Sequence, residues 1–149
     1  MKPLVHFVAS SLISSFVYIL YRSIGVSLIA FVAGIFIDLD YILDYLLNYG
    51  LRHAWRNWRE FYSVCDEMKF EKVYLFLHSF ELVILLWILV RCLSYFYGAR
   101  TVNLYRALAI GFTQHLLLDF FSNPVHPLAY FLWFRICNKF RKDRFLQLY

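Results

Sequence analysis

The sequence from Gly111 to Asp119 reads GFTQHLLLD, which sets a histidine and an aspartate four residues apart within an apolar segment. On an α-helix, residues at this spacing lie on one face, with their Cβ atoms about 5 to 6 Å apart. His115 and Asp119 could therefore bind one metal ion together. A hydrogen-bonded polar pair between packed helices has the same spacing, so the pair alone leaves both interpretations open.

The whole chain is too apolar for an ordinary soluble domain. Hydrophobic residues make up 62% of its 149 residues, whereas soluble proteins are close to half apolar. We therefore predict an integral membrane protein and expect the net charge of +5 to reflect loop topology, with no nucleic acid as a partner. A disulfide framework or zinc ribbon is not expected, because the three cysteines lie far apart without a CxxC motif: Cys65, Cys92 and Cys137.

Four apolar segments are each close to the 20 residues that a helix needs to cross a bilayer. They run from about residue 4 to 21, 24 to 48, 73 to 97 and 103 to 122. The first has no small-residue cleavage site before Arg22, so we interpret it as a retained span and not as a signal peptide. The sequence thus predicts an all-α fold, a single transmembrane domain built as a bundle of four transmembrane helices.

The polar segments predict how the bundle is oriented. Residues 51–72 place Trp55, Trp58 and Tyr62 on one helical face, which is typical of an interfacial amphipathic helix between the second and third spans. Residues 135–149 form a basic tail. Lysine and arginine favour the cytoplasmic side, and only four basic residues lie outside the N-terminus, residues 51–72 and the tail: Arg22, Arg91, Arg100 and Arg106. We predict a multi-pass protein of the cell (plasma or inner) membrane, with both termini cytoplasmic.

Every predicted span carries a histidine or an acid toward its cytoplasmic end. With a rise of 1.5 Å per residue, these residues fall in one layer: His6, Asp38, Asp40, His78, Glu81, His115 and Asp119. A carboxylate in hydrocarbon costs about 2.5 to 3.5 kcal/mol, and a shared divalent metal ion would offset that cost. Imidazole with carboxylate is a ligand set for zinc above all, with manganese or iron as alternatives.

Spacing refines this layer. His78 and Glu81, three residues apart, are expected on one face of the third span. Asp38 and Asp40 point about 200 degrees apart in a regular helix, so both can face the site only where the helix is locally opened. Asp44 lies one turn beyond Asp40, near the headgroups, where we expect it to face water.

These motifs resemble those of a known membrane protein family. Its members, small integral membrane proteins classed as membrane-bound metal-dependent hydrolases, show an early His, a PDxDH-like motif, an HRxxTHS-like motif and an HxxxD motif. The likeness extends over all four spans and is carried by His6, Asp38-Leu-Asp40, His78-Ser79 and His115 with Asp119. The chain departs from the family at Ile37, Tyr41 and Val73, in place of Pro, His and His, and Glu81 and His126 could substitute for the missing ligands. The resemblance implies metal binding more strongly than any named reaction.

Three functions are consistent with this pattern. The first is a membrane-embedded metal-dependent hydrolase, acting near the cytoplasmic face on a phospholipid or another phosphoester. Its metal ligands would be His6, Asp40, His78, His115 and Asp119, with Asp38 or Glu81 as the catalytic base or as a group that orients the ligands. The second is an ion-handling protein or transporter, although the chain shows no internal repeat. The third is a structural four-helix protein whose intramembrane His/Asp network only joins helices.

Overall fold

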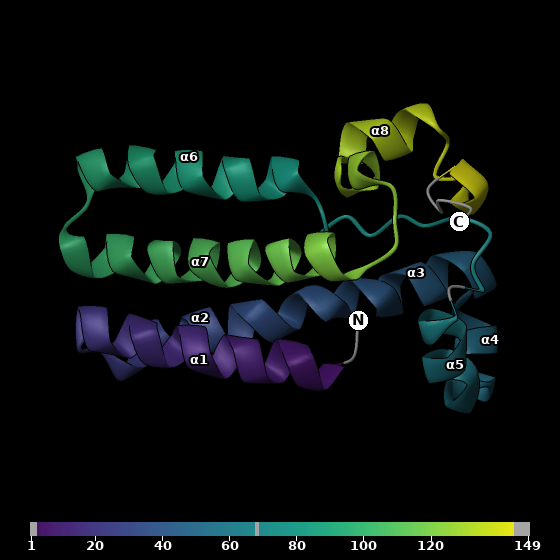
Figure 1. Ribbon diagram of the computed structural model, residues 1–149, viewed down its shortest axis with the longest axis horizontal. Helices are drawn as coiled ribbons and strands as arrows, with labels where there is room; N and C mark the ends of the chain where they lie inside the picture. The colour runs from purple at the N-terminus through teal and green to yellow at the C-terminus, as the bar shows by residue number, and fades with distance from the viewer. Residues whose placement is uncertain (1–2, 68, 145–149) are drawn as a thin grey trace. The chain divides into compact units, whose positions relative to one another are not determined.

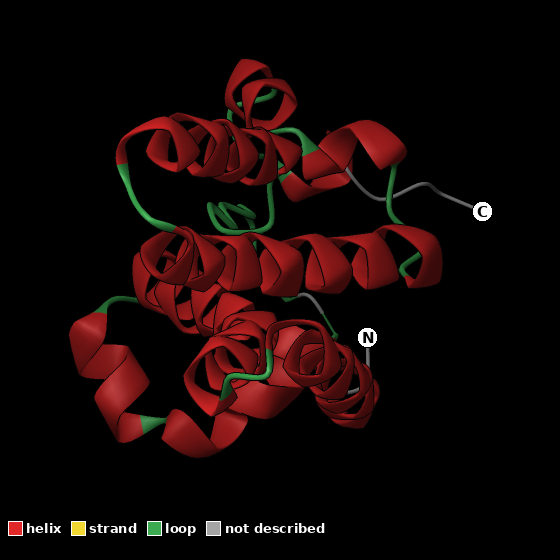
Figure 2. Cartoon of the chain, turned by 90° about the vertical axis from the view of Figure 1, so that its left-hand side faces the viewer, coloured by secondary structure: helices red, strands yellow, loops and turns green. Residues whose placement is uncertain are grey.

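A computed structural model describes residues 3–67 and 69–144, and these residues form helices joined by loops and turns (Figure 2). The predicted all-α class is confirmed. The α-helices are α1 (Pro3–Tyr21), α2 (Ile24–Phe36), α3 (Asp40–Tyr49), α4 (Leu51–Arg56), α5 (Phe61–Asp66), α6 (Phe80–Phe96), α7 (Ala99–Ser122) and α8 (Leu132–Cys137). Short 3-10 helices are η1 (Ile37–Leu39), η2 (Trp58–Glu60), η3 (Pro127–Tyr130) and η4 (Lys142–Arg144).

The chain divides into two compact units. The first unit, residues up to 37 together with 80–123, contains α1, α2, α6 and α7. In it α2 packs against α1 and α7, and α6 lies alongside α7 (Figure 1). Helix α1 ends at Tyr21 because Arg22 adopts a left-handed conformation, with φ at 49°, which reverses the chain into α2. Helix α7 ends at Ser122, just before the Asn123-Pro124 pair that disfavours further helix.

Two glycines allow the helices of the first unit to approach closely. A Cβ atom on Gly111 would lie 2.5 Å from the Ala30 carbonyl oxygen of α2, and one on Gly34 would collide with the Ser10 hydroxyl of α1. Ser10 itself donates a hydrogen bond of 3.2 Å to the Gln114 side chain of α7. The backbones of α1, α2 and α7 can therefore meet only because these positions lack side chains.

The second unit, residues 38–79 and those from 124 onward, is built around a small aromatic core. Helix α3 ends where Gly50 takes a φ of 80°, a conformation that suits glycine. Residues 51–66 then fold as α4, η2 and α5, three short pieces in place of one continuous amphipathic helix. The buried apolar residues of this region are Tyr45, Ala54, Val64 and Phe70.

The helix that the sequence predicts from Val73 begins only at Phe80. Residues 73–79 are not helical, because their backbone groups are bonded by side chains from α3 and α8, as described below. Two helical segments, Leu4–Tyr21 and Ile24–Tyr49, are long and apolar enough to cross a membrane. The four-span bundle and the interfacial position of residues 51–72 stay predictions.

Candidate functional site

Three of the predicted ligands meet within the first unit, and we refer to His6, His115 and Asp119 as the His6 group. His6 comes from the first turns of α1, and the other two residues come from α7. Their exposed fractions are 3% or less. The His6 Nε2 atom lies 3.1 Å from Asp119 Oδ1, and His115 Nε2 lies 3.4 Å from Asp119 Oδ2. The predicted i, i+4 pair on α7 is therefore joined by a second histidine.

The backbone of α2 fixes the orientation of the His115 ring. Its Nδ1 atom lies 2.6 Å from the Gly34 carbonyl oxygen, which can only accept a hydrogen bond, so Nδ1 carries the proton and donates it. In the neutral ring, Nε2 then presents a lone pair toward the Asp119 carboxylate. Two electron-rich atoms at this distance are stable together only when a proton or a metal ion lies with them.

Stacking of the His6 and His115 rings limits how far protonation can stabilise the cluster. The His6 and His115 rings are stacked, with centroids 3.9 Å apart and planes inclined by 16°. If both rings were protonated, two like charges about 4 Å apart would repel by about 4 kcal/mol at an effective dielectric constant near 20. A single carboxylate therefore faces two imidazoles that cannot both be charged without a large penalty.

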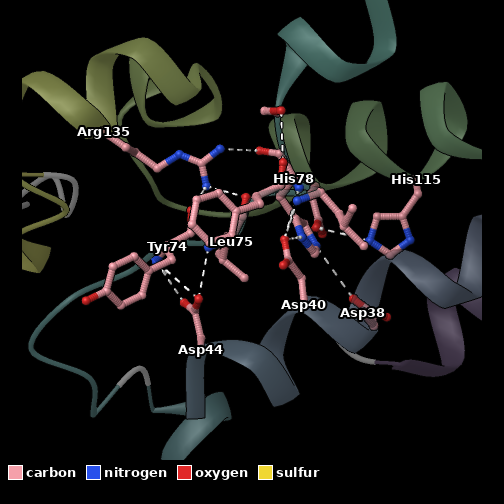
Figure 3. Close-up of polar contacts among 12 residues, drawn as sticks. Asp38, Asp40, Asp44, Tyr74, Leu75, His78, His115 and Arg135 are labelled. Carbon is pink, nitrogen blue, oxygen red and sulfur yellow. Dashed lines mark hydrogen bonds and ion pairs between the residues drawn. The ribbon is translucent and has the colours of Figure 1, made fainter. Parts of the chain in front are cut away.

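The second unit contains a cluster of its own, Asp38, Asp40 and His78, which we refer to as the His78 group. His78 Nδ1 lies 3.4 Å from Asp40 Oδ2, and His78 Nε2 lies 3.7 Å from Asp38 Oδ1 (Figure 3). Both carboxylates reach the same imidazole because η1 interrupts the helix at Ile37–Leu39, as the requirement for a local opening predicts. Asp40 and His78 are buried, whereas the Asp38 side chain is 33% exposed.

Asp40 has a second role in the loop that carries His78. Its Oδ2 atom accepts hydrogen bonds from the backbone amides of Leu77 and His78. Its buried Oδ1 atom makes no hydrogen bond to any residue that the structure describes. One oxygen thus orients the loop, and the other is left as a potential metal ligand.

Glu81 does not share a helical face with His78, so that prediction is wrong. His78 precedes α6, and Glu81 lies half-buried in the first turn of that helix. The reason is the late start of α6, since the i, i+3 relation holds only within a continuous helix.

Sequence reasoning missed two polar residues next to the His78 group. Asp44 was expected to face water, yet it is fully buried and accepts hydrogen bonds from the amides of Tyr74 and Leu75. Arg135, assigned to the basic tail, is 2% exposed and donates to three backbone carbonyls. The only available signal was the four-residue spacing of Asp44 from Asp40.

Imidazole nitrogens and carboxylate oxygens are donor atoms that suit a cation. Two ligand atoms on a tetrahedral zinc ion lie about 3.3 Å apart, given bonds of about 2.0 to 2.1 Å. The separations within the His6 group, 3.1 and 3.4 Å, are close to this value. Buried histidine and aspartate side chains of this chain could therefore hold a metal ion.

Comparison with known proteins adds no assignment to this geometry. The chain matches no protein-family model, no curated protein and no solved structure.

Proposed function

We propose that this chain is a membrane-embedded metal-dependent hydrolase. The proposed metal ligands are His6, His115 and Asp119 in the His6 group, and Asp40 and His78 in the His78 group. Zinc is the proposed metal, because neutral imidazole and carboxylate are its common ligands, and manganese or iron accept the same set. When bound, such an ion polarises the reacting oxygen of an ester and activates water for attack.

One observation supports this proposal more than any other. The bond from His115 Nδ1 to the Gly34 carbonyl directs the lone pair of Nε2 toward Asp119, which lies 3.4 Å away. Metal-binding histidines are commonly oriented by a bond from their second nitrogen to a carbonyl. The stacked His6 ring disfavours the alternative in which protons alone neutralise the cluster.

Asp38 is the proposed catalytic base, with Glu81 as the alternative. Asp38 is the most exposed of the six side chains in the two groups, at 33%. A base must exchange protons with substrate and solvent, and a fully buried carboxylate does this poorly. Its contact with His78 Nε2, at 3.7 Å, is also longer than those within the His6 group.

The proposed substrate is a phosphoester or a lipid-like molecule that is reached from the cytoplasmic side of the membrane. The first unit exposes many large apolar side chains, among them Leu12 at 68%, Ile24 at 75% and Leu85 at 61%. Such surfaces favour contact with lipid. The proposed orientation in the plasma or inner membrane has both termini cytoplasmic, and reporter fusions to each terminus test it.

Metal analysis of the detergent-purified chain tests the proposal. We expect stoichiometric zinc in the wild-type protein and loss of most of it in His115→Ala and Asp119→Asn. His126→Ala is the matched control, because it removes a histidine that contacts Phe134 and Leu128 outside both groups. A wild-type protein without bound metal would refute the proposal and favour a structural His/Asp network.

Hydrolysis of a generic phosphodiester or of a labelled phospholipid separates an enzyme from an ion-handling protein. Asp119→Asn should abolish turnover together with metal binding. Asp38→Asn should lower turnover by about 100-fold or more while the metal content stays unchanged, as expected for loss of a general base. A metal-loaded chain that hydrolyses neither substrate would favour the ion-handling alternative.

A further inference from the structure

Helix α3 carries a row of polar side chains along one face. Asp40, Asp44 and Asn48 are four residues apart, which places them one above another on a helix. Each of them bonds to the backbone of the non-helical segment 72–78. Asp40 accepts from the amides of Leu77 and His78, Asp44 from those of Tyr74 and Leu75, and Asn48 both accepts from the Lys72 amide and donates to its carbonyl.

Arg135 of α8 binds the carbonyl groups of the same segment. Its Nη1 atom donates to the Tyr74 carbonyl at 2.7 Å and to the Leu75 carbonyl, and its Nη2 atom donates to the His78 carbonyl at 2.9 Å (Figure 3). The planar guanidinium can address several acceptors in fixed directions, which a lysine ammonium cannot do. Amides and carbonyls of the segment are thus held by charged side chains of opposite sign.

The segment held in this way is strained. Leu75 has a φ of 39°, in the left-handed region that branched and bulky side chains rarely adopt. Strained backbone of this kind persists only where the surrounding structure enforces it, and it is concentrated at functional sites. Leu75, the strained residue, lies three residues before His78, and like Tyr74 it is bonded by both Asp44 and Arg135.

We propose that Asp44 and Arg135 are positioning residues, which fix segment 73–78 and thereby hold the His78 imidazole between Asp38 and Asp40. Neither residue is proposed to touch a metal ion or a substrate. The consequence for metal binding rests on the proposed function, whereas the consequence for the His78 ring does not.

Two readouts on the metal-free, detergent-purified chain test the positioning role. The first is hydrogen exchange of the Tyr74 and Leu75 amides, which should accelerate about tenfold to a hundredfold in Asp44→Asn, since bonds to a charged acceptor are lost. The second is the side-chain ¹⁵N spectrum of His78, assigned with His78→Ala, which should shift in both Asp44→Asn and Arg135→Lys. Asp143→Asn and Arg141→Lys are the matched controls, because this exposed pair lies in the same unit, and they should change neither readout.

Zinc titration then tests the consequence for the site. Asp44→Asn and Arg135→Lys should weaken zinc binding by about 10-fold to 100-fold, as for other residues that orient metal ligands. If Asp44→Asn does not fold, Arg135→Lys, which keeps the charge and most of the volume, decides the question alone. Unchanged exchange or an unchanged His78 spectrum overturns the proposal, and so does altered exchange with unchanged zinc affinity. A wild-type chain that binds no zinc overturns the proposed function only, and the two metal-free readouts then decide the positioning role.

Discussion

Substitution of Gly111 by alanine should disturb the His6 group, although Gly111 lies about one helical turn before His115. The added Cβ atom would lie 2.5 Å from the Ala30 carbonyl oxygen and 2.7 Å from the Ala33 Cβ atom. Contacts of real Cβ atoms begin at about 3.0 Å and are ordinary from 3.4 Å. Because the carbonyl oxygen is part of the α2 backbone and cannot rotate away, α7 must move by about 0.5 to 0.9 Å.

That displacement acts on the bond that orients His115. The distance from His115 Nδ1 to the Gly34 carbonyl, now 2.6 Å, would increase to about 3.1 to 3.5 Å, the outer limit of a hydrogen bond. We expect a loss of about 1 to 3 kcal/mol in the free energy of unfolding from overpacking. Zinc affinity should fall by about 10-fold to 100-fold, because the ring loses its fixed orientation.

The assays are unfolding in mixed detergent micelles, followed by circular dichroism, and zinc titration of the folded protein. Gly25→Ala is the matched control, since a Cβ atom there meets nothing within 4 Å. Alanine is the better helix former, so this control should be neutral or stabilising by up to about 1 kcal/mol. If Gly111→Ala behaves like Gly25→Ala in both assays, the close contact of α2 with α7 does not set the geometry of His115.

Two further predictions concern other parts of the chain. Arg22→Gly should stabilise the fold by about 1 kcal/mol in the same unfolding assay. Arg22 is exposed, and its left-handed φ of 49° carries a steric cost that glycine avoids. The control Arg91→Gly, at an exposed position within α6, should destabilise the fold instead. Cys65 should react with iodoacetamide at pH 8 about 30-fold more slowly in the folded protein than in the unfolded chain, measured with Cys92 and Cys137 replaced by serine. Burial, reinforced by the charge of Asp44, raises the pKa of its thiol from 9.0 to about 12, so the reactive thiolate is scarce. Equal rates in the two states would contradict this shift.

Hydropathy predicted the helices that depend on local sequence alone. The apolar run that ends at Tyr21 and the run that ends at Ser122 correspond to α1 and α7, whose ends are set by a left-handed residue and by a proline. Spacing on one helix also predicted the pairing of His115 with Asp119, which is confirmed by their 3.4 Å contact. These features follow from residues within a few positions of each other, which is the range that such patterns cover.

The region around His78 could not be predicted in this way. Residues 73–79 are mostly apolar, like the helix that follows, so their hydropathy gave no clear sign of a loop. The groups that keep them from being helical, Asp44 and Arg135, lie about 30 positions before and 60 positions after them. A charged residue that bonds a distant backbone segment cannot be distinguished by sequence from one that faces water, and this is why both residues were expected at the surface.

The spacing of Asp40, Asp44 and Asn48 on α3 also constrains how many residues segment 72–78 can contain. Successive members stand about 6 Å apart along the helix axis, the rise of four helical residues, while each residue of an extended chain covers at most about 3.3 to 3.6 Å. Deletion of one residue between Lys72 and His78 would shift the remaining backbone amides by roughly half of the spacing between successive side chains on α3. The carboxylates of Asp40 and Asp44 would then face backbone carbonyls. The number of residues in this stretch is therefore fixed more strictly than the identity of its solvent-facing side chains.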